Sequence, residues 1–356
     1  MKLAPFLLHG VVLFATLCGT ALADAGPLVM ERLETEAGRF PWFHARAGQS
    51  GPVQRILIIL HGHARDMNDS LAAGLRVAEL AGTDAGVLVV APLFPVRTGA
   101  AACSRADTPA FEAGDAEWTC SDWQEGGLAH GRALSAFAAM DRLLAELGRR
   151  WPEAHQVTLA GFSAGGQFVQ RYAGFAQIPA DMRLRFVVAD PGSWLYPDDR
   201  RPQPVKHGEA VDWRACTAAT GEGACDFSWS VPADCPAALD WKFGLRNRPA
   251  HLALPPEILQ ARRAAADIVY LEGALDTGEG PGSAYRILDK SCGARAQGPY
   301  RLQRGLAFAA HENTFIRPDR PAPLIVIPGC GHQPACVLTS PLARPWLLPS
   351  ATSVAH

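Results

Sequence analysis

Short apolar runs alternate with stretches of helical periodicity along most of the chain. Each run is continuous and rich in valine, isoleucine and leucine, as is typical of strands buried on both faces of a sheet. The runs span residues 55–60, 86–94, 156–162, 185–190, 267–275 and 324–329. Stretches with helical periodicity lie between them at residues 128–149, 164–174 and 299–315. The alternation predicts an α/β fold, with a mostly parallel sheet flanked by helices.

Two segments depart from this alternation. Residues 31–48 are expected to form an antiparallel hairpin that enters the sheet. Residues 193–260, which follow the sixth expected strand, are rich in proline, tryptophan and cysteine and have no sustained period. A loop of this length inside a compact domain is normally a functional insertion, and here we expect a lid. Its tryptophans and cysteines disfavour a disordered linker.

The N-terminus has the features of a secretory signal peptide. Lys2 precedes an apolar run, which ends at the small residues of Ala21–Ala23. The run is too short and interrupted for a membrane span, so none is expected after cleavage. We expect residues 1–23 to be removed, leaving a single domain over residues 24–356 that is secreted or periplasmic.

The cysteine content agrees with an oxidising compartment. Cys18 leaves with the signal peptide, and an even number of cysteines remains, which predicts disulfides. The pairing does not follow from the sequence, although short separations favour local links. Such links would join Cys330 to Cys336, and Cys216 to Cys225 or Cys235. The formal net charge of −2 and the lack of a basic run argue against a nucleic-acid partner.

A serine lies where one strand is expected to end and a helix to begin. Residues Gly161–Gly165 read Gly-Phe-Ser-Ala-Gly, which matches the G-x-S-x-G pattern of a nucleophile on a sharp turn. Such a turn lifts the hydroxyl of Ser163 out of the backbone. Gly161 and Gly165 have no side chains that would collide across this turn, and Gly166 lets the next helix lie close to the sheet. Ser163 is therefore the candidate nucleophile.

A serine hydroxyl needs a base to take its proton, and the base needs a carboxylate to orient it. His332 follows the last expected strand and is the candidate base. Asp276 follows the preceding strand and is the candidate acid, in the chain order of α/β-hydrolases. Asp190, at the end of another strand, is a rival acid. Glu272 lies inside its strand and is expected to point away from the site.

The stretch His61-Gly62-His63 suggests either a metal site or a turn that binds an oxyanion. The zinc pattern H-x-H-x-D-H would require aspartate at position 65 and histidine at 66, where the chain has Arg65 and Asp66. No metal or other cofactor is therefore expected. The turn would donate the backbone N–H of His63, and Ala164 would supply the second N–H. His61 would then be structural.

These motifs resemble the α/β-hydrolase superfamily over nearly all of the mature sequence. The stretches HGHARDMND, GFSAGGQFVQRYA, DPGSWLY and PGCGH are similar to those of exported bacterial serine esterases related to polyhydroxyalkanoate-depolymerase and feruloyl-esterase-like enzymes. The resemblance implies the α/β-hydrolase fold, a Ser163–His332–Asp276 triad and ester hydrolysis. It does not imply a particular substrate.

The leading hypothesis is a serine esterase acting on a small-molecule or oligomeric ester. A peptidase or amidase would use the same triad, and a non-catalytic binding protein on this fold would normally lack one of its members. Four residues in loops after strands are weaker candidates for lining the cleft, because packing explains them equally well. They are Trp118, Trp123, Ser193 and Trp194.

Overall fold

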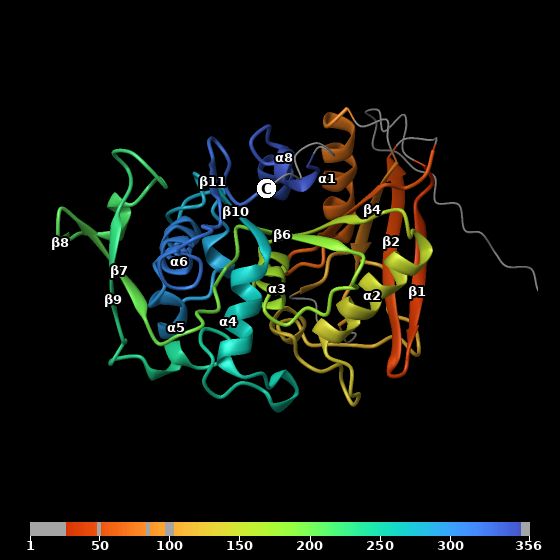
Figure 1. Cartoon of the computed structure of the whole chain (residues 1–356), viewed down its shortest axis with the longest axis horizontal. Coiled ribbons are helices and arrows are strands. Elements are labelled where there is room, and N and C mark those ends of the chain that lie inside the picture. Colours follow the sequence, from red (N-terminus) through yellow and green to blue (C-terminus); the bar gives the residue numbers. More distant parts are fainter. Residues whose placement is uncertain (1–25, 48–50, 83–85, 97–102, 350–356) are drawn as a thin grey trace, which may run out of the picture.

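An eight-stranded sheet forms the centre of the computed structural model, which describes residues 26–47, 51–82, 86–96 and 103–349. The expected signal peptide at 1–23 lies outside these residues. The strand order is β1-β2-β4-β3-β5-β6-β10-β11, and the last six strands in this order run parallel (Figure 1). The strands are β1 (Val29–Thr35), β2 (Gly38–Ala47), β3 (Arg55–Leu60), β4 (Val87–Pro92), β5 (Gln156–Phe162), β6 (Arg183–Ala189), β10 (Asp267–Gly273) and β11 (Leu324–Ile327). The predicted α/β architecture is confirmed.

The expected entry hairpin is also confirmed. β1 and β2 pair antiparallel and close at the Thr35–Gly38 pair, where Gly38 has φ of 120°. β2 then pairs antiparallel with β4, with Ala45 opposite Val89. The hairpin therefore adds an antiparallel edge to the parallel strands.

Helices cover both faces of this sheet (Figure 1). One face packs against α1, α7 and α8, and the other against α2, α3, α4 and α6. Their bounds are α1 (Met67–Leu80), α2 (Ala136–Arg150), α3 (Ala164–Tyr172), α4 (Pro256–Ala265), α6 (Arg301–Phe315), α7 (Pro334–Thr339) and α8 (Arg344–Leu347), and the short α5 spans Cys292–Arg295. A sheet covered on both sides explains the continuous apolar runs of its strands.

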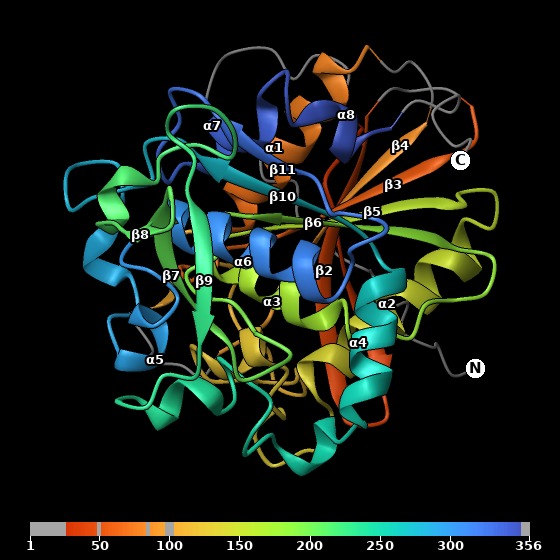
Figure 2. The same ribbon diagram turned by 60° about the vertical axis from the view of Figure 1, so that its left-hand side comes forward.

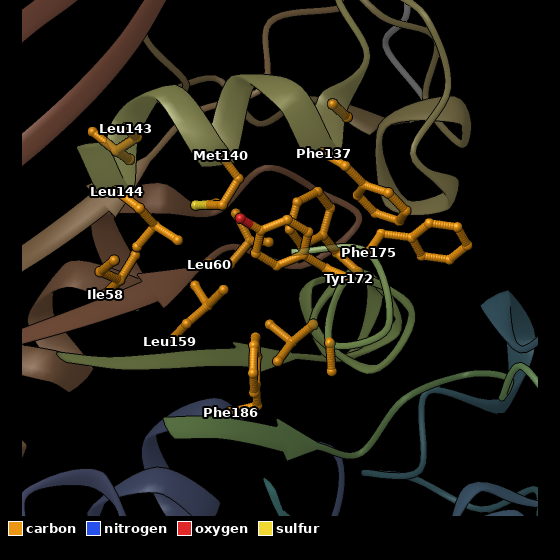
Figure 3. Packing of buried hydrophobic residues seen from close by; sticks show 14 of the residues in the cluster. Ile58, Leu60, Phe137, Met140, Leu143, Leu144, Leu159, Tyr172, Phe175 and Phe186 are labelled. Atoms are coloured by element: carbon orange, nitrogen blue, oxygen red, sulfur yellow. The ribbon is translucent and has the colours of Figure 1, made fainter. Parts of the chain in front are cut away.

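Successive residues of a strand enter opposite layers of the core. In β3, Ile58 and Leu60 face the α2 and α3 side, whereas Leu57 and Ile59 face α1. Figure 3 shows the first of these layers, in which strand residues lie beneath Phe137 and Met140 of α2 and Tyr172 of α3. Burying each large side chain of this kind stabilises the fold by about 1.5–3 kcal/mol.

The second expected helix begins later than the sequence suggested. Periodicity predicted a start at residue 128, but α2 begins at Ala136. Ser135 caps the helix, because its Oγ accepts the backbone N–H of Ala138 at 3.0 Å. Gly131 in the preceding loop has φ of 64°, which a helix cannot contain. The start at 128 was therefore wrong.

Residues 193–260 contain regular structure that their composition did not reveal. Three strands form a small sheet in the order β8-β7-β9, with β7 at Arg201–Lys206, β8 at Glu209–Ala210 and β9 at Asp226–Ser230. This sheet lies beside α6 (Figure 2). α4 begins before the segment ends. The role of the segment as a lid stays a prediction.

Four disulfides link cysteines of the described residues. Cys330–Cys336 and Cys216–Cys225 are two of the local links considered from the sequence. Cys235 pairs with Cys292 instead of Cys216, and this bond links the 193–260 segment to α5. The fourth disulfide joins Cys103 to Cys120. Among the described residues, none of the helices has the length and apolar character needed to span a membrane.

The close packing of α1 on the sheet predicts opposite effects of one substitution at two helical glycines. A Cβ at Gly74 would lie 2.6 Å from Val89 Cγ1, whereas one at Gly148 of α2 would meet only Met182 Cε at 3.6 Å. Ala is favoured over Gly in a helix by about 1 kcal/mol, but overpacking costs about 1–3 kcal/mol. Urea unfolding should show Gly74→Ala destabilised and Gly148→Ala stabilised. Equal effects of the two substitutions would contradict this packing.

Candidate active site

Ser163 lies in the turn between β5 and α3 in a strained conformation. Its φ is 58° and its ψ is −116°, a combination that costs a residue with a side chain about 1–3 kcal/mol. Its backbone N–H donates to the carbonyl of Ala189 in β6 at 2.9 Å. The neighbouring strand thus holds the turn in place, and Ser163 remains 8% exposed.

The glycines around Ser163 are required by close backbone contacts. A Cβ at Gly161 would lie 2.2 Å from the carbonyl oxygen of Gly165. One at Gly165 would lie 2.5 Å from the carbonyl oxygen of Leu60, and one at Gly166 would lie 2.6 Å from that of Ala189. Real Cβ atoms do not approach other atoms this closely. The turn is therefore packed closely between β3 and β6, with no room for a side chain at these three positions.

The structure brings Ser163, His332 and Asp276 into one hydrogen-bonded row. His332 Nε2 lies 2.9 Å from Ser163 Oγ, and His332 Nδ1 lies 2.6 Å from Asp276 Oδ2. A carboxylate accepts only, so Nδ1 carries the proton and Nε2 is free to accept one from the serine. The side chains of His332 and Asp276 are 7% and 1% exposed.

The environment of His332 favours the neutral imidazole. Burial is the largest cause that lowers its pKa, and the positive charge of Arg301 lowers it further. The carboxylates of Asp276 and Asp66 act in the opposite direction. The ring is supported by Phe162, whose centroid lies 4.7 Å away. A neutral, oriented imidazole is what general-base chemistry requires.

The His61-Gly62-His63 turn lies beside the serine. A Cβ on Gly62 would lie 3.8 Å from Ser163 Cβ, and the Gly62 N–H donates to Asp66 Oδ1 at 2.8 Å. The N–H groups of His63 and Ala164 have no hydrogen-bond partner within the described part of the chain. Two free donors near the Oγ of Ser163 are available to a bound oxygen.

His61 has the structural role expected of it. It is fully buried, and its Nδ1 lies 2.8 Å from the carbonyl oxygen of Gly62. Its Nε2 accepts the backbone N–H of Phe94 at 3.2 Å. Burial lowers the pKa of His61 to about 4, so the ring is neutral. It joins the turn to the segment that follows β4.

Asp190, the rival acid, lies close to Asp276 and His332 but has a different partner. Its Oδ1 accepts the N–H of Gly273 at 2.7 Å, and no hydrogen bond joins it to His332. Burial, together with the negative charge of Asp276, raises the pKa of Asp190 to about 8. The hydrogen-bonded acid of this arrangement is therefore Asp276.

Glu272 does not point away from the site as the sequence suggested. Its carboxyl group is fully buried next to Asp190, where Gly305 of α6 leaves room for it. Burial, followed by the charge of Asp190, raises the pKa of Glu272 well above its usual range. The facing carboxyl oxygens of this pair have no N–H or O–H donor in the described residues. A hydrogen bond between them requires a proton on one carboxyl.

One atom each from Asp190, Asp276 and His332 lies within 4.8 Å of the other two, close enough to share a metal ion. However, both ring nitrogens of His332 already have partners in Asp276 and Ser163. The proton held by Asp190 would also have to leave before the carboxyl could bind a cation. These groups therefore fit proton transfer better than metal binding.

The weaker cleft candidates all lie in the core. Trp118, Trp123, Ser193 and Trp194 are at most 1% exposed. Trp123 packs on Phe94 with its ring centroid 5.3 Å away. Their burial favours the packing role over direct contact with a substrate. Arg301, which approaches Asp276 from α6, was not identified from the sequence.

No protein-family model matches the chain, and no curated protein matches it significantly. Among solved structures, the chain is similar to poly(aspartic acid) hydrolase-1 from Sphingomonas sp. KT-1, at 18% identity and a TM-score of 0.56. The match covers 87% of this chain and 95% of that one. The chain has the α/β-hydrolase fold.

A poly(3-hydroxybutyrate) depolymerase from Bordetella parapertussis is also similar, at 21% identity and a TM-score of 0.49. That match covers 84% of this chain and 80% of the depolymerase. Likeness at such low sequence identity does not specify the chemistry.

The buried carboxyl pair predicts a pH-dependent stability. Because the pKa of Asp190 is raised from 3.8 to about 8, its contribution to stability is complete below pH 4 and is lost as the pH rises through 8. Asp190→Asn removes this titration. The free energy of unfolding of the variant relative to wild type should therefore increase between pH 4 and pH 8, by about 1 kcal/mol or more.

Urea unfolding at several pH values measures this difference. Asp234→Asn, at an exposed position, controls for the substitution itself. A difference between Asp190→Asn and wild type that stays constant from pH 4 to pH 8 would show that Asp190 is ionised in the folded protein.

Proposed function

We propose that the protein is a serine hydrolase that cleaves carboxylic esters through an acyl-enzyme intermediate. The observation that carries the proposal is the hydrogen-bonded row from Ser163 Oγ through His332 to Asp276. The strained turn under Ser163 supports it, because such strain is retained where the surrounding contacts and function require it. The α/β-hydrolase fold is consistent with this chemistry but does not specify it.

In the proposed reaction, Ser163 Oγ attacks the ester carbonyl carbon while His332 Nε2 takes the hydroxyl proton. Asp276 stabilises the imidazolium that forms. The developing negative charge on the carbonyl oxygen is held by the N–H groups of His63 and Ala164. One donor of this kind is worth about 3–4 kcal/mol of barrier. His332 then protonates the leaving alkoxide, and water attacks the acyl-enzyme by the same steps.

An amide substrate is the alternative with the same groups. The leaving amine is far more basic than an alcohol and has to be protonated by His332 as the C–N bond breaks. In the proposed reaction, His332 would protonate an amine or an alkoxide in the same way. Ester and amide substrates must therefore be compared by experiment.

We also propose that the enzyme works outside the cytoplasm as a single domain over residues 24–356. Four disulfides support this, because such bonds persist in oxidising compartments. The signal peptide proposed at 1–23 would be absent from the mature protein, whose first residue would be Asp24. N-terminal sequencing of the exported protein would identify the cleavage site.

Hydrolysis of p-nitrophenyl esters of increasing chain length tests the proposed chemistry. Ser163→Ala and His332→Gln should each lower kcat/KM by about 10,000-fold, because the nucleophile and the base act as a unit. Ser70→Ala removes another buried serine, located in α1, and should retain turnover.

The p-nitroanilides of the same acyl groups distinguish the two substrate classes. Turnover of the esters alone supports the esterase, and preferred turnover of the anilides moves the assignment to an amidase. Ester turnover that survives Ser163→Ala would contradict the proposed nucleophile.

A further inference from the structure

The first turn of α6 holds the acid of the triad in place. The backbone N–H of Leu302 donates to the carbonyl of Asp276 at 3.2 Å. The hydroxyl of Thr277 donates to Gln303 Oε1 at 3.1 Å. Two consecutive residues of the loop after β10 are thus bound to two consecutive residues at the start of the helix. The position of Asp276 therefore depends on α6 as well as on its own strand.

Arg301, the first residue of α6, reaches both the acid and the loop that supports the base. Its Nη1 donates to the carbonyl of Ser283 at 2.7 Å and lies 3.4 Å from Asp276 Oδ1. The side chains of Arg301 and Asp276 are 3% and 1% exposed. An ion pair with so little solvent is screened weakly, so the guanidinium acts strongly on its neighbours.

The same loop contacts His332 through its backbone. The carbonyl of Gly282 accepts the N–H of His332 at 2.7 Å. A Cβ at Gly331 would lie 2.6 Å from this carbonyl oxygen, so the two segments meet without side chains between them. Gly282 has φ of 85°, a conformation that favours glycine. A single guanidinium therefore connects the acid with Ser283, the residue next to the one whose carbonyl supports the base.

Charged and titratable groups from several elements surround this connection. His332 is affected by Arg301 from α6, by Asp276 after β10 and by Asp66 after β3. Arg301 in turn acts on Asp190 after β6 and on Glu272 in β10, as well as on Asp276. Of the three buried carboxyl groups, Asp276 is the one that forms an ion pair with the guanidinium.

We propose that Arg301 is a positioning residue of the triad, which holds Asp276 at a fixed distance from His332 through the Ser283 carbonyl. The proposal rests on the proposed serine-hydrolase function. Arg301 does not contact the substrate, and it acts only through Asp276, His332 and the loop between them. Its removal should alter how readily His332 accepts the proton of Ser163.

The rate of inactivation by a fluorophosphonate, measured from pH 5 to pH 9, tests this role without knowledge of the natural substrate. In Arg301→Gln, the inactivation rate should fall on the order of 10- to 100-fold, as expected for a slightly misplaced catalytic group. The acid limb of the pH profile should move to higher pH, because the imidazolium of His332 no longer faces the guanidinium charge. Arg301→Lys keeps the charge, and its acid limb should stay at the wild-type position.

The rate should still fall at least about tenfold in Arg301→Lys, because an ammonium group does not reproduce the fixed geometry of a guanidinium. Arg317→Gln is the matched control. This arginine lies just beyond α6, is also buried, and donates to the carbonyls of Arg263 and Ala266. Its loss should lower stability but leave the acid limb unchanged.

The outcomes separate this proposal from the proposed function. If the fluorophosphonate does not modify Ser163 in the wild type, the serine-hydrolase proposal fails and the Arg301 proposal fails with it. If the wild type is inactivated but Arg301→Gln keeps the wild-type acid limb, or moves it to lower pH, the role of Arg301 alone is overturned. Should Arg301→Gln not fold, a wild-type inactivation rate in Arg301→Lys would overturn it equally.

Discussion

The arrangement of the site depends on the backbone packing of the turn that follows β5. Gly165 lies against the carbonyl of Leu60 in β3, and Gly166 lies against the carbonyl of Ala189 in β6. The N–H of Ser163 is bound to that same residue of β6. Both neighbouring strands therefore hold the serine in its strained conformation. The segments that continue from these strands, the His61 turn and Asp190, consequently end next to Ser163.

Burial determines which of the nearby acids can be charged. Three carboxyl groups lie behind the imidazole, in a region from which water is almost excluded. Asp276 has both His332 and Arg301 as partners, whereas Asp190 and Glu272 face each other. Burial raises the pKa of both carboxyl groups of the second pair, which favours their protonated forms. This division is consistent with Asp276 as the acid of the proposed triad.

Much of this site could be predicted because a parallel sheet brings the carboxyl ends of its strands to one edge. Ser163, Asp276 and His332 follow three such strands, so their proximity follows from the order of apolar runs and loops. Contacts that depend on side chains across the fold were not predictable in this way. Arg301 begins a helix 25 residues after Asp276, and no local pattern indicates that the two would meet.

The expectation for Glu272 failed for a related reason. The side chains of β10 alternate between the two faces of the sheet, and that of Glu272 points toward α6. The carboxyl group fits there because α6 has Gly305, without a side chain, at the point of contact. The small sheet of residues 193–260 was also missed, because its strands are short and two of the six residues in β7 are prolines. Strand prediction depends on longer alternating runs without proline.

The most direct test of the central claim is a crystal structure of the enzyme after reaction with a fluorophosphonate. The proposed mechanism predicts one adduct, on Ser163 Oγ, with the phosphoryl oxygen about 2.7–3.1 Å from the backbone nitrogens of both His63 and Ala164. An adduct on another residue would contradict the proposed nucleophile. A phosphoryl oxygen that points away from both nitrogens would contradict the proposed oxyanion site.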